Sequence, residues 1–222
     1  METSSSNPTA DTNKDRLLEG IRDFNTREFV PNQLLFDELK EKQTPHTLFI
    51  GCSDSRVVPH MLTKSFAGEL FVVRNIGNLV PLYKRKSVTY VATSAVIEYA
   101  VNQLNVKNIV VCGHSNCGGC AALYKDKELK KLPQTKNWLE LAKPVKERVE
   151  KKIAKNKIKL EDREAYTEKL NVVLQIRHLM DYPYIRKKVK EGELNVYGWY
   201  YQIEEGRIYN YDKEQKKFIK VE

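Results

Sequence analysis

The chain has 222 residues, of which 41% are hydrophobic and 30% charged, and its formal net charge at pH 7 is +9. This length suits one large domain or two small ones, and the hydrophobic fraction suffices for a buried core. The positive charge does not indicate a nucleic-acid partner. About +6 of it lies in residues 125–170, where 15 basic and 9 acidic side chains mix at helical spacing, which is typical of a solvated helix face.

The N-terminal segment METSSSNPTADTNK is polar and lacks an apolar run. It resembles neither a signal peptide nor a membrane span, so we expect a cytoplasmic protein without a membrane partner. We predict a disordered polar tail over residues 1–13. A single domain is expected over 14–222, in which 14–42 forms an N-terminal helical arm.

Apolar spacing predicts the elements in chain order. Two N-terminal helices are expected over 14–29 and 34–42, separated by a break at Pro31. Short apolar runs predict strands over 47–51, 70–74 and 108–112, and a buried helix over 88–104 with an inward stripe of Val88, Val91, Ala92, Ala95 and Tyr99. Further helices are expected over 120–125, 138–155 and 162–180 and after Pro183, followed by a hairpin over 194–211.

Strands that alternate with helices indicate an α/β fold. We predict a central, mostly parallel β-sheet flanked by helices on both faces, with an antiparallel C-terminal edge hairpin. In such sheets, sites form beyond the carboxyl ends of the strands. Cys52 follows the first predicted strand, and His114 and Cys117 follow the third.

These three residues predict a metal site. Cys52 precedes His114 by 62 residues, but neighbouring parallel strands would bring the two strand ends together. Two thiolates and one imidazole suit zinc, and three protein ligands leave a fourth position for water, as in catalytic sites. A closed site with Cys120 as fourth ligand is the alternative. The remaining cysteine, Cys112, lies in an apolar run and is expected to be a buried hydrophobic residue.

Asp54 and Arg56 favour the open site. A carboxylate two residues beyond a zinc thiolate could orient the metal-bound water, and a guanidinium two residues later could hold it ionised. Taken alone, Asp54 would more simply cap a helix and Arg56 would lie on the surface. Zinc lowers the pKa of bound water to around 7, so the site could hydrate CO₂, hydrolyse an ester or amide, or deaminate a base.

The motifs CSDSR (52–56) and HSNCGG (114–119) resemble those of the β-class carbonic anhydrases. The resemblance extends through GELFVVRNIGNLVP (68–81) and AVIEYAV (95–101), and covers roughly residues 33–212. It implies one Zn²⁺ per chain on Cys52, His114 and Cys117, a catalytic Asp54–Arg56 dyad, and reversible hydration of CO₂ to bicarbonate by attack of zinc hydroxide.

The resemblance also implies a substrate pocket and an oligomer. The family's substrate glutamine matches Gln43, and its apolar pocket matches Phe71, Ile76 and Tyr99. Because a helix N-terminus favours anions, the backbone N–H groups near Gly118 and Gly119 could also help to hold the bicarbonate. Family members build each pocket across a dimer interface, so a homodimer or a dimer-based homotetramer is expected. Phe49 stands where the bicarbonate-inhibited branch has tryptophan, which favours water as the fourth ligand.

Three other functions remain open at this point. Relatives on the same scaffold hydrolyse carbon disulfide or carbonyl sulfide, and the sequence does not show whether such gases could enter. A non-catalytic, zinc-stabilised binding module would have four protein ligands. An enzyme with Cys52 as nucleophile would not need zinc, but it gives no reason for Cys117 to lie three residues after His114. None of His46, His60 and His178 is placed at the site as a proton carrier.

Overall fold

The computed structural model describes residues 10–85 and 89–222. The chain divides into two units, Met1–Gln43 and Thr44–Glu222. Residues 1–9 of the expected polar tail lie outside the described part. Among the described residues, no helix combines the length and the apolar character needed to cross a membrane.

The N-terminal unit is helical from Ala10 to Leu39, and its last residues, 40–43, are not helical. It consists of α1 (Ala10–Asp23), a π-helical turn (Phe24–Phe29), a 3-10 turn (Val30–Asn32) and α2 (Gln33–Leu39). The expected break near Pro31 is confirmed, because α2 begins as a separate helix only after the 3-10 turn that contains Pro31. Pro31 has no N–H to donate to the preceding helical turn, and the next residue, Asn32, has non-helical φ and ψ angles of −114° and 22°. The helix also begins at Ala10, four residues earlier than expected.

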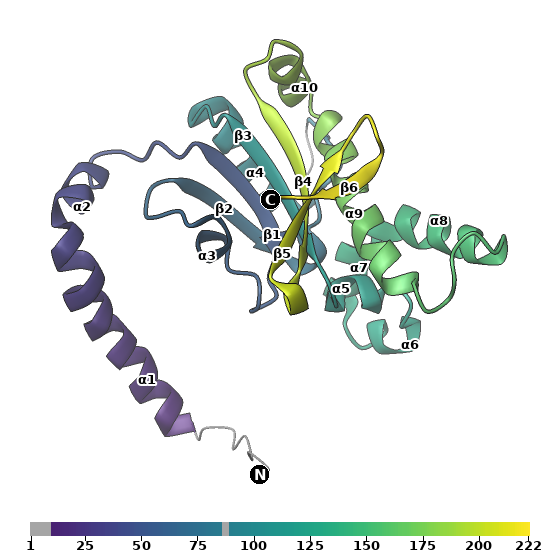
Figure 1. Cartoon of the computed structure of the whole chain (residues 1–222), viewed down its shortest axis with the longest axis horizontal. Helices are drawn as coiled ribbons and strands as arrows, with labels where there is room; N and C mark the ends of the chain where they lie inside the picture. Colours follow the sequence, from purple (N-terminus) through teal and green to yellow (C-terminus); the bar gives the residue numbers. More distant parts are fainter. Residues whose placement is uncertain (1–9, 86–88) are drawn as a thin grey trace. The chain divides into compact units, whose positions relative to one another are not determined.

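The second unit is built on one six-stranded sheet with the order β2-β1-β3-β4-β5-β6. Strands β1 (Thr47–Cys52), β2 (Leu70–Asn75), β3 (Asn108–His114) and β4 (Asn195–Gln202) are parallel. Strands β5 (Arg207–Asp212) and β6 (Lys217–Lys220) continue the sheet in antiparallel pairs (Figure 1). The predicted sheet and C-terminal hairpin are confirmed, and β6 is an additional edge strand.

The main core lies between one face of the sheet and three helices, α4 (Val91–Glu98), α9 (Arg163–Met180) and α10 (Pro183–Lys190). Two glycines let α9 approach the strands closely. A Cβ on Gly113 would lie 2.5 Å from Val172 Cγ2, and one on Gly198 would lie 2.4 Å from Ile176 Cδ1. A smaller cluster on the other face contains Cys112, which is fully buried as expected.

The expected inward stripe of the helix after β2 is wrong. Val91 and Tyr99 are 52% and 48% exposed, and Ala92 and Ala95 are exposed as well, whereas Ile97 is fully buried. Val88 lies outside the described residues. Apolar residues occur on both the exposed and the buried face of this helix, so helical spacing alone does not identify the buried face. It also begins at Val91 and ends in a π-helical turn, Tyr99–Gln103.

The helices between β3 and β4 are more divided than expected. After α5 (Gly118–Ala122) come α6 (Asp126–Leu129), α7 (Pro133–Leu139) and α8 (Lys143–Ala154). The single helix expected over 138–155 is therefore wrong, because Pro144 begins a new helix. The helix expected over 162–180 is confirmed as α9. Helices α6 and α7 were not expected, and neither was the short helix α3 (Pro59–Thr63).

Candidate active site

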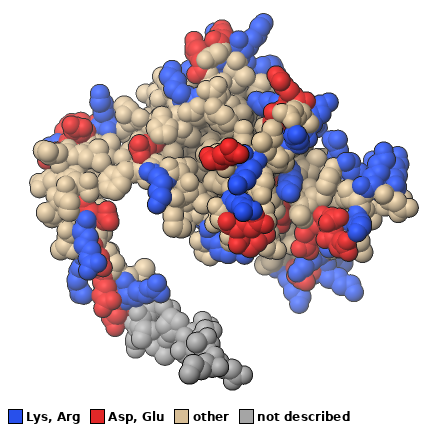
Figure 2. All heavy atoms as spheres, viewed as in Figure 1, with Lys and Arg blue, Asp and Glu red and all other residues tan. Residues whose placement is uncertain are grey.

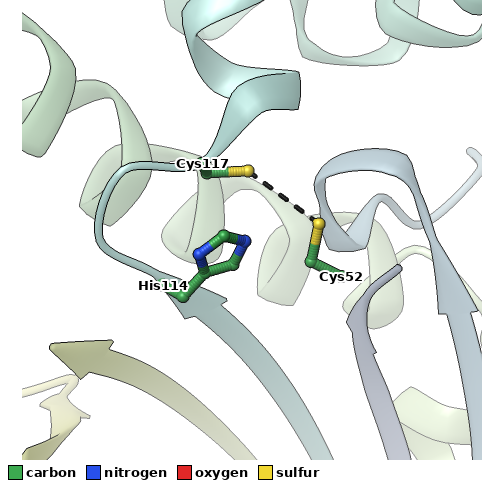
Figure 3. A group of neighbouring side chains, drawn as sticks. All are labelled: Cys52, His114 and Cys117. Atoms are coloured by element: carbon green, nitrogen blue, oxygen red, sulfur yellow. Dashed lines mark hydrogen bonds between the residues drawn. The ribbon is translucent and has the colours of Figure 1, made fainter. Parts of the chain in front are cut away.

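The three predicted metal ligands lie together at one end of the sheet. Cys52 is the last residue of β1, His114 is the last residue of β3, and Cys117 is the N-cap residue of α5. Because β1 and β3 are parallel neighbours, their carboxyl ends meet. The Cys52 and Cys117 sulfurs are 4.0 Å apart, and the ligand atoms of all three residues lie within 4.8 Å of one another (Figure 3).

The chemistry of this cluster fits a metal ion. His114 Nδ1 lies 2.9 Å from the carbonyl oxygen of Ser115 and can donate to it, which directs the lone pair of Nε2 toward the sulfurs. Nε2 is buried and has no hydrogen-bond partner among the described residues. A hydrogen bond that the Cys52 thiol donates to Cys117, together with burial, raises the pKa of Cys52 to about 12. A cation on these atoms would satisfy Nε2 and favour the thiolates, and the S, N, S donor set suits zinc.

Cys120 is buried beside the cluster without joining it. It lies in α5 and packs against Cys52 and Cys117. Its sulfur is not among the atoms that lie within 4.8 Å of one another. The arrangement therefore offers three converging protein ligands, as an open site requires.

Asp54 and Arg56 form a bidentate ion pair beside the cluster. Arg56 Nε donates to Asp54 Oδ1 at 2.9 Å and Arg56 Nη2 to Oδ2 at 2.8 Å. These bonds hold the pKa of Asp54 well below its usual range, so the carboxylate is ionised. Asp54 Oδ2 is 3.9 Å from His114 Nε2. An oriented acceptor thus lies next to the metal ligands, and Arg56 Nη2 also bonds the Asn116 carbonyl at 3.0 Å.

Two residues that the sequence analysis missed hold the backbone of this site. Arg74 donates to the carbonyl of Cys52 at 2.9 Å and to that of Asp54 at 2.6 Å. Glu168, on α9, accepts the backbone N–H of Cys117 at 2.9 Å and the hydroxyl of Tyr200 at 2.9 Å. The available signal for Arg74 was an arginine at the end of the apolar run of β2.

Glu168 begins a buried polar row along α9. Asn171 donates to the Gly77 carbonyl at 2.8 Å, Gln175 accepts the Val80 N–H at 2.8 Å, and His178 Nδ1 lies 2.8 Å from the Val80 carbonyl. These bonds fix segment 77–80, directly after Ile76. His178 is therefore a core histidine, and burial lowers its pKa.

The expected pocket residues are only partly brought together. Ile76 packs against α5, since a Cβ on Gly119 would lie 3.0 Å from Ile76 Cγ2 and 3.1 Å from Gly77 N. A Cβ on Gly118, by contrast, would meet nothing within 4 Å.

The rings of Phe71 and Tyr99 are 5.9 Å apart. Phe71 pairs with Leu48, four residues before Cys52, which is roughly 13 Å along the strand. Gln43 ends the N-terminal unit, so its role as a substrate ligand stays a prediction.

Comparison with known proteins identifies the family. The family model described as carbonic anhydrase matches residues 47–208. A carbonic anhydrase of Helicobacter pylori is 40% identical over 91% of this chain and 92% of its own, and one of Pseudomonas aeruginosa is 37% identical over 92% and 90%. The solved β-carbonic anhydrase CcaA superposes with a TM-score of 0.86 at 36% identity, covering 94% of this chain and all of that one. The chain belongs to the β-class carbonic anhydrases, the family of enzymes that hydrate CO₂.

Proposed function

We propose that this chain hydrates CO₂ reversibly to bicarbonate and a proton, with one zinc ion held by Cys52, His114 and Cys117. The observation that carries the proposal is the buried, unpartnered Nε2 of His114, which lies among two cysteine sulfurs and 3.9 Å from an ionised carboxylate. When bound, zinc would supply an acidified water with a pKa near 7.

The Asp54–Arg56 pair provides the orienting group. Both oxygens of Asp54 are held by Arg56, so the carboxylate is kept as an ionised acceptor rather than a further metal ligand. Asp54 can accept a hydrogen bond from the attacking water and turn its oxygen lone pair toward CO₂. Arg74 and Glu168 hold the backbone of Cys52 and Cys117, which keeps the ligands in position for this role.

The substrate side of the site is proposed to be shared between subunits. Gln43, Phe71, Ile76 and Tyr99 would line the CO₂ pocket, and the N–H groups of Gly118 and Gly119 would receive the bicarbonate. Phe71 lies on β2 opposite Leu48, and Tyr99 at the start of the π-helical turn is exposed, as expected if a second subunit completes the pocket. A solved relative from Sordaria macrospora, at TM-score 0.77 and 34% identity, is described as tetrameric. We propose a homodimer or a homotetramer of this chain, in the cytoplasm.

The test is stopped-flow CO₂ hydration followed with a pH indicator, on protein of known zinc content. Cys52→Ser should lose both zinc and hydration. The matched control is Cys112→Ala, because Cys112 is fully buried on β3 but is not one of the three ligands. Stoichiometric zinc without hydration between about pH 7 and 9 would contradict the proposal and favour hydrolysis of sulfur-containing gases.

A further inference from the structure

A basic hollow lies between α8, α9 and the β5–β6 hairpin. Its volume is about 320 Å³, and its wall carries five cationic side chains. Arg148 and Lys152 come from α8, Lys169 and Arg177 from α9, and Lys216 from the turn before β6. Cations from three separate elements therefore converge on one concave surface, and no acidic side chain lines it among the described residues.

The five charges are not neutralised by the protein. None of them forms an ion pair with another residue of the described chain. Lys152 instead donates to the hydroxyl of Tyr166, and Lys169 lies 4.8 Å from the ring centroid of Tyr200. Like charges gathered in this way repel one another, and a bound anion would relieve that repulsion.

This charge is a property of the hollow and not of α8 in general. A second hollow of about 260 Å³, on another side of α8, is lined by three lysines and four acidic residues. There Lys146 pairs with Asp126 at 3.3 Å, so the charges are balanced within the protein. Figure 2 shows both basic and acidic side chains over the α8 end of the second unit.

The hollow also has an apolar part. The half-buried rings of Tyr166, Tyr211 and Phe218 contribute to its wall, and the last two pack together with centroids 5.3 Å apart. A volume of about 320 Å³ is at the lower end of the range for small-molecule sites. A bounded hollow of this size suits a small molecule with several negative groups better than a polymer that needs an extended basic track.

From this combination we propose that the hollow binds a small organic polyphosphate, meaning a carbon skeleton that bears two or more phosphate groups. Arg148 and Arg177 would contact phosphate oxygens through their planar guanidinium groups, and the lysines would add charge. The carbon skeleton would lie against the apolar wall. The site is separate from the candidate metal centre, and its occupation does not depend on the proposed reaction.

The test is isothermal titration calorimetry on the full-length, zinc-loaded protein with two probes, inorganic tripolyphosphate and ATP. Arg148→Gln/Arg177→Gln should weaken the binding of both probes by about tenfold. The matched control is Lys151→Gln/Lys190→Gln, which removes two charges from exposed positions outside the hollow. The control should bind as the unaltered protein does, and added salt should weaken binding throughout.

Tighter binding of ATP than of tripolyphosphate would support the proposal, and equal affinities would overturn the role given to the carbon skeleton and the apolar wall. Absence of saturable binding up to about 1 mM probe would overturn the proposal. It would also be overturned if the control variant lost as much affinity for the probes as the double-arginine variant. If a single-stranded oligonucleotide bound through Arg148 and Arg177 more tightly than ATP, the surface would be a nucleic-acid footprint instead. If the double variant changed the mass of the assembly in sedimentation, it would be a contact between copies.

Discussion

Replacement of Glu168 by methionine tests whether α9 holds the metal-ligand loop. Glu168 is 3% exposed, and its two oxygens accept the N–H of Cys117 and the hydroxyl of Tyr200, which are themselves 1% and 3% exposed. Methionine fills a similar volume but accepts neither bond. The substitution therefore leaves two buried donors without partners and opens little space.

The loss of folding stability can be calculated from those two unsatisfied donors. Each unsatisfied buried donor costs about 1–3 kcal/mol, which gives about 2–6 kcal/mol for the pair. Burial raises the pKa of Glu168, so removal of the carboxylate also removes a desolvation cost. We therefore expect Glu168→Met to lower the free energy of unfolding by about 2–4 kcal/mol. Because Cys117 loses its anchor, zinc affinity should fall by about 10- to 100-fold.

Glu168→Gln is the matched control. Its amide oxygen can still accept the Cys117 N–H, and its amide group can donate to the oxygen of Tyr200. We expect this substitution to lower the free energy of unfolding by no more than about 1 kcal/mol. The free energy of unfolding would be measured in urea, and zinc affinity by competition with a chelating indicator. The reasoning would be refuted if the methionine and glutamine variants had the same stability and bound zinc equally well.

Three further perturbations have definite expected outcomes. Arg56 lowers the pKa of Asp54, so their pairing contributes stability above the unfolded-state pKa of about 4 and loses it as the pH falls through the lower folded-state value. Arg56→Gln should therefore destabilise the protein at pH 7 and less so in strong acid, as measured by urea unfolding against pH. Gly113→Ala should cost about 1–3 kcal/mol in the same assay, because its Cβ would lie 2.5 Å from Val172, whereas Gly118→Ala should be nearly neutral. Chelation of zinc should lower the urea midpoint, and added zinc should restore it.

The metal-ligand cluster could be predicted from sequence because its geometry follows from topology. Cys52 and His114 end two apolar strands, and parallel neighbours place such ends side by side. Cys117 follows within the turn that begins α5. The Asp54–Arg56 pair is equally local, with only two residues of separation. Strand patterns and short sequence spacings were therefore sufficient to predict the metal ligands and the Asp54–Arg56 pair.

The supporting residues could not be predicted in this way. Glu168, Asn171 and Gln175 form a polar stripe on α9, and such a stripe normally indicates a solvent-facing side. Here it is buried, and its partners are backbone groups 51 to 95 residues away in sequence. Periodicity does not reveal partners at that distance. The buried face of α4 was predicted wrongly for a related reason. Apolar residues also occur on exposed surfaces that a second subunit could cover, so apolar spacing does not by itself identify the core-facing side.

Helix α9 links the stability of the fold to the geometry of the site. Gly113 and Gly198 allow it to pack closely on β3 and β4, and its polar row then reaches the backbone of Cys117 and of segment 77–80. The strand ends place the metal ligands near one another, but strand pairing does not fix the turn that carries Cys117. That turn is held by Arg56, through the Asn116 carbonyl, and by Glu168. The position of Glu168 depends on how closely α9 lies against the sheet. A substitution that displaces α9 should therefore weaken zinc binding even though it touches no ligand.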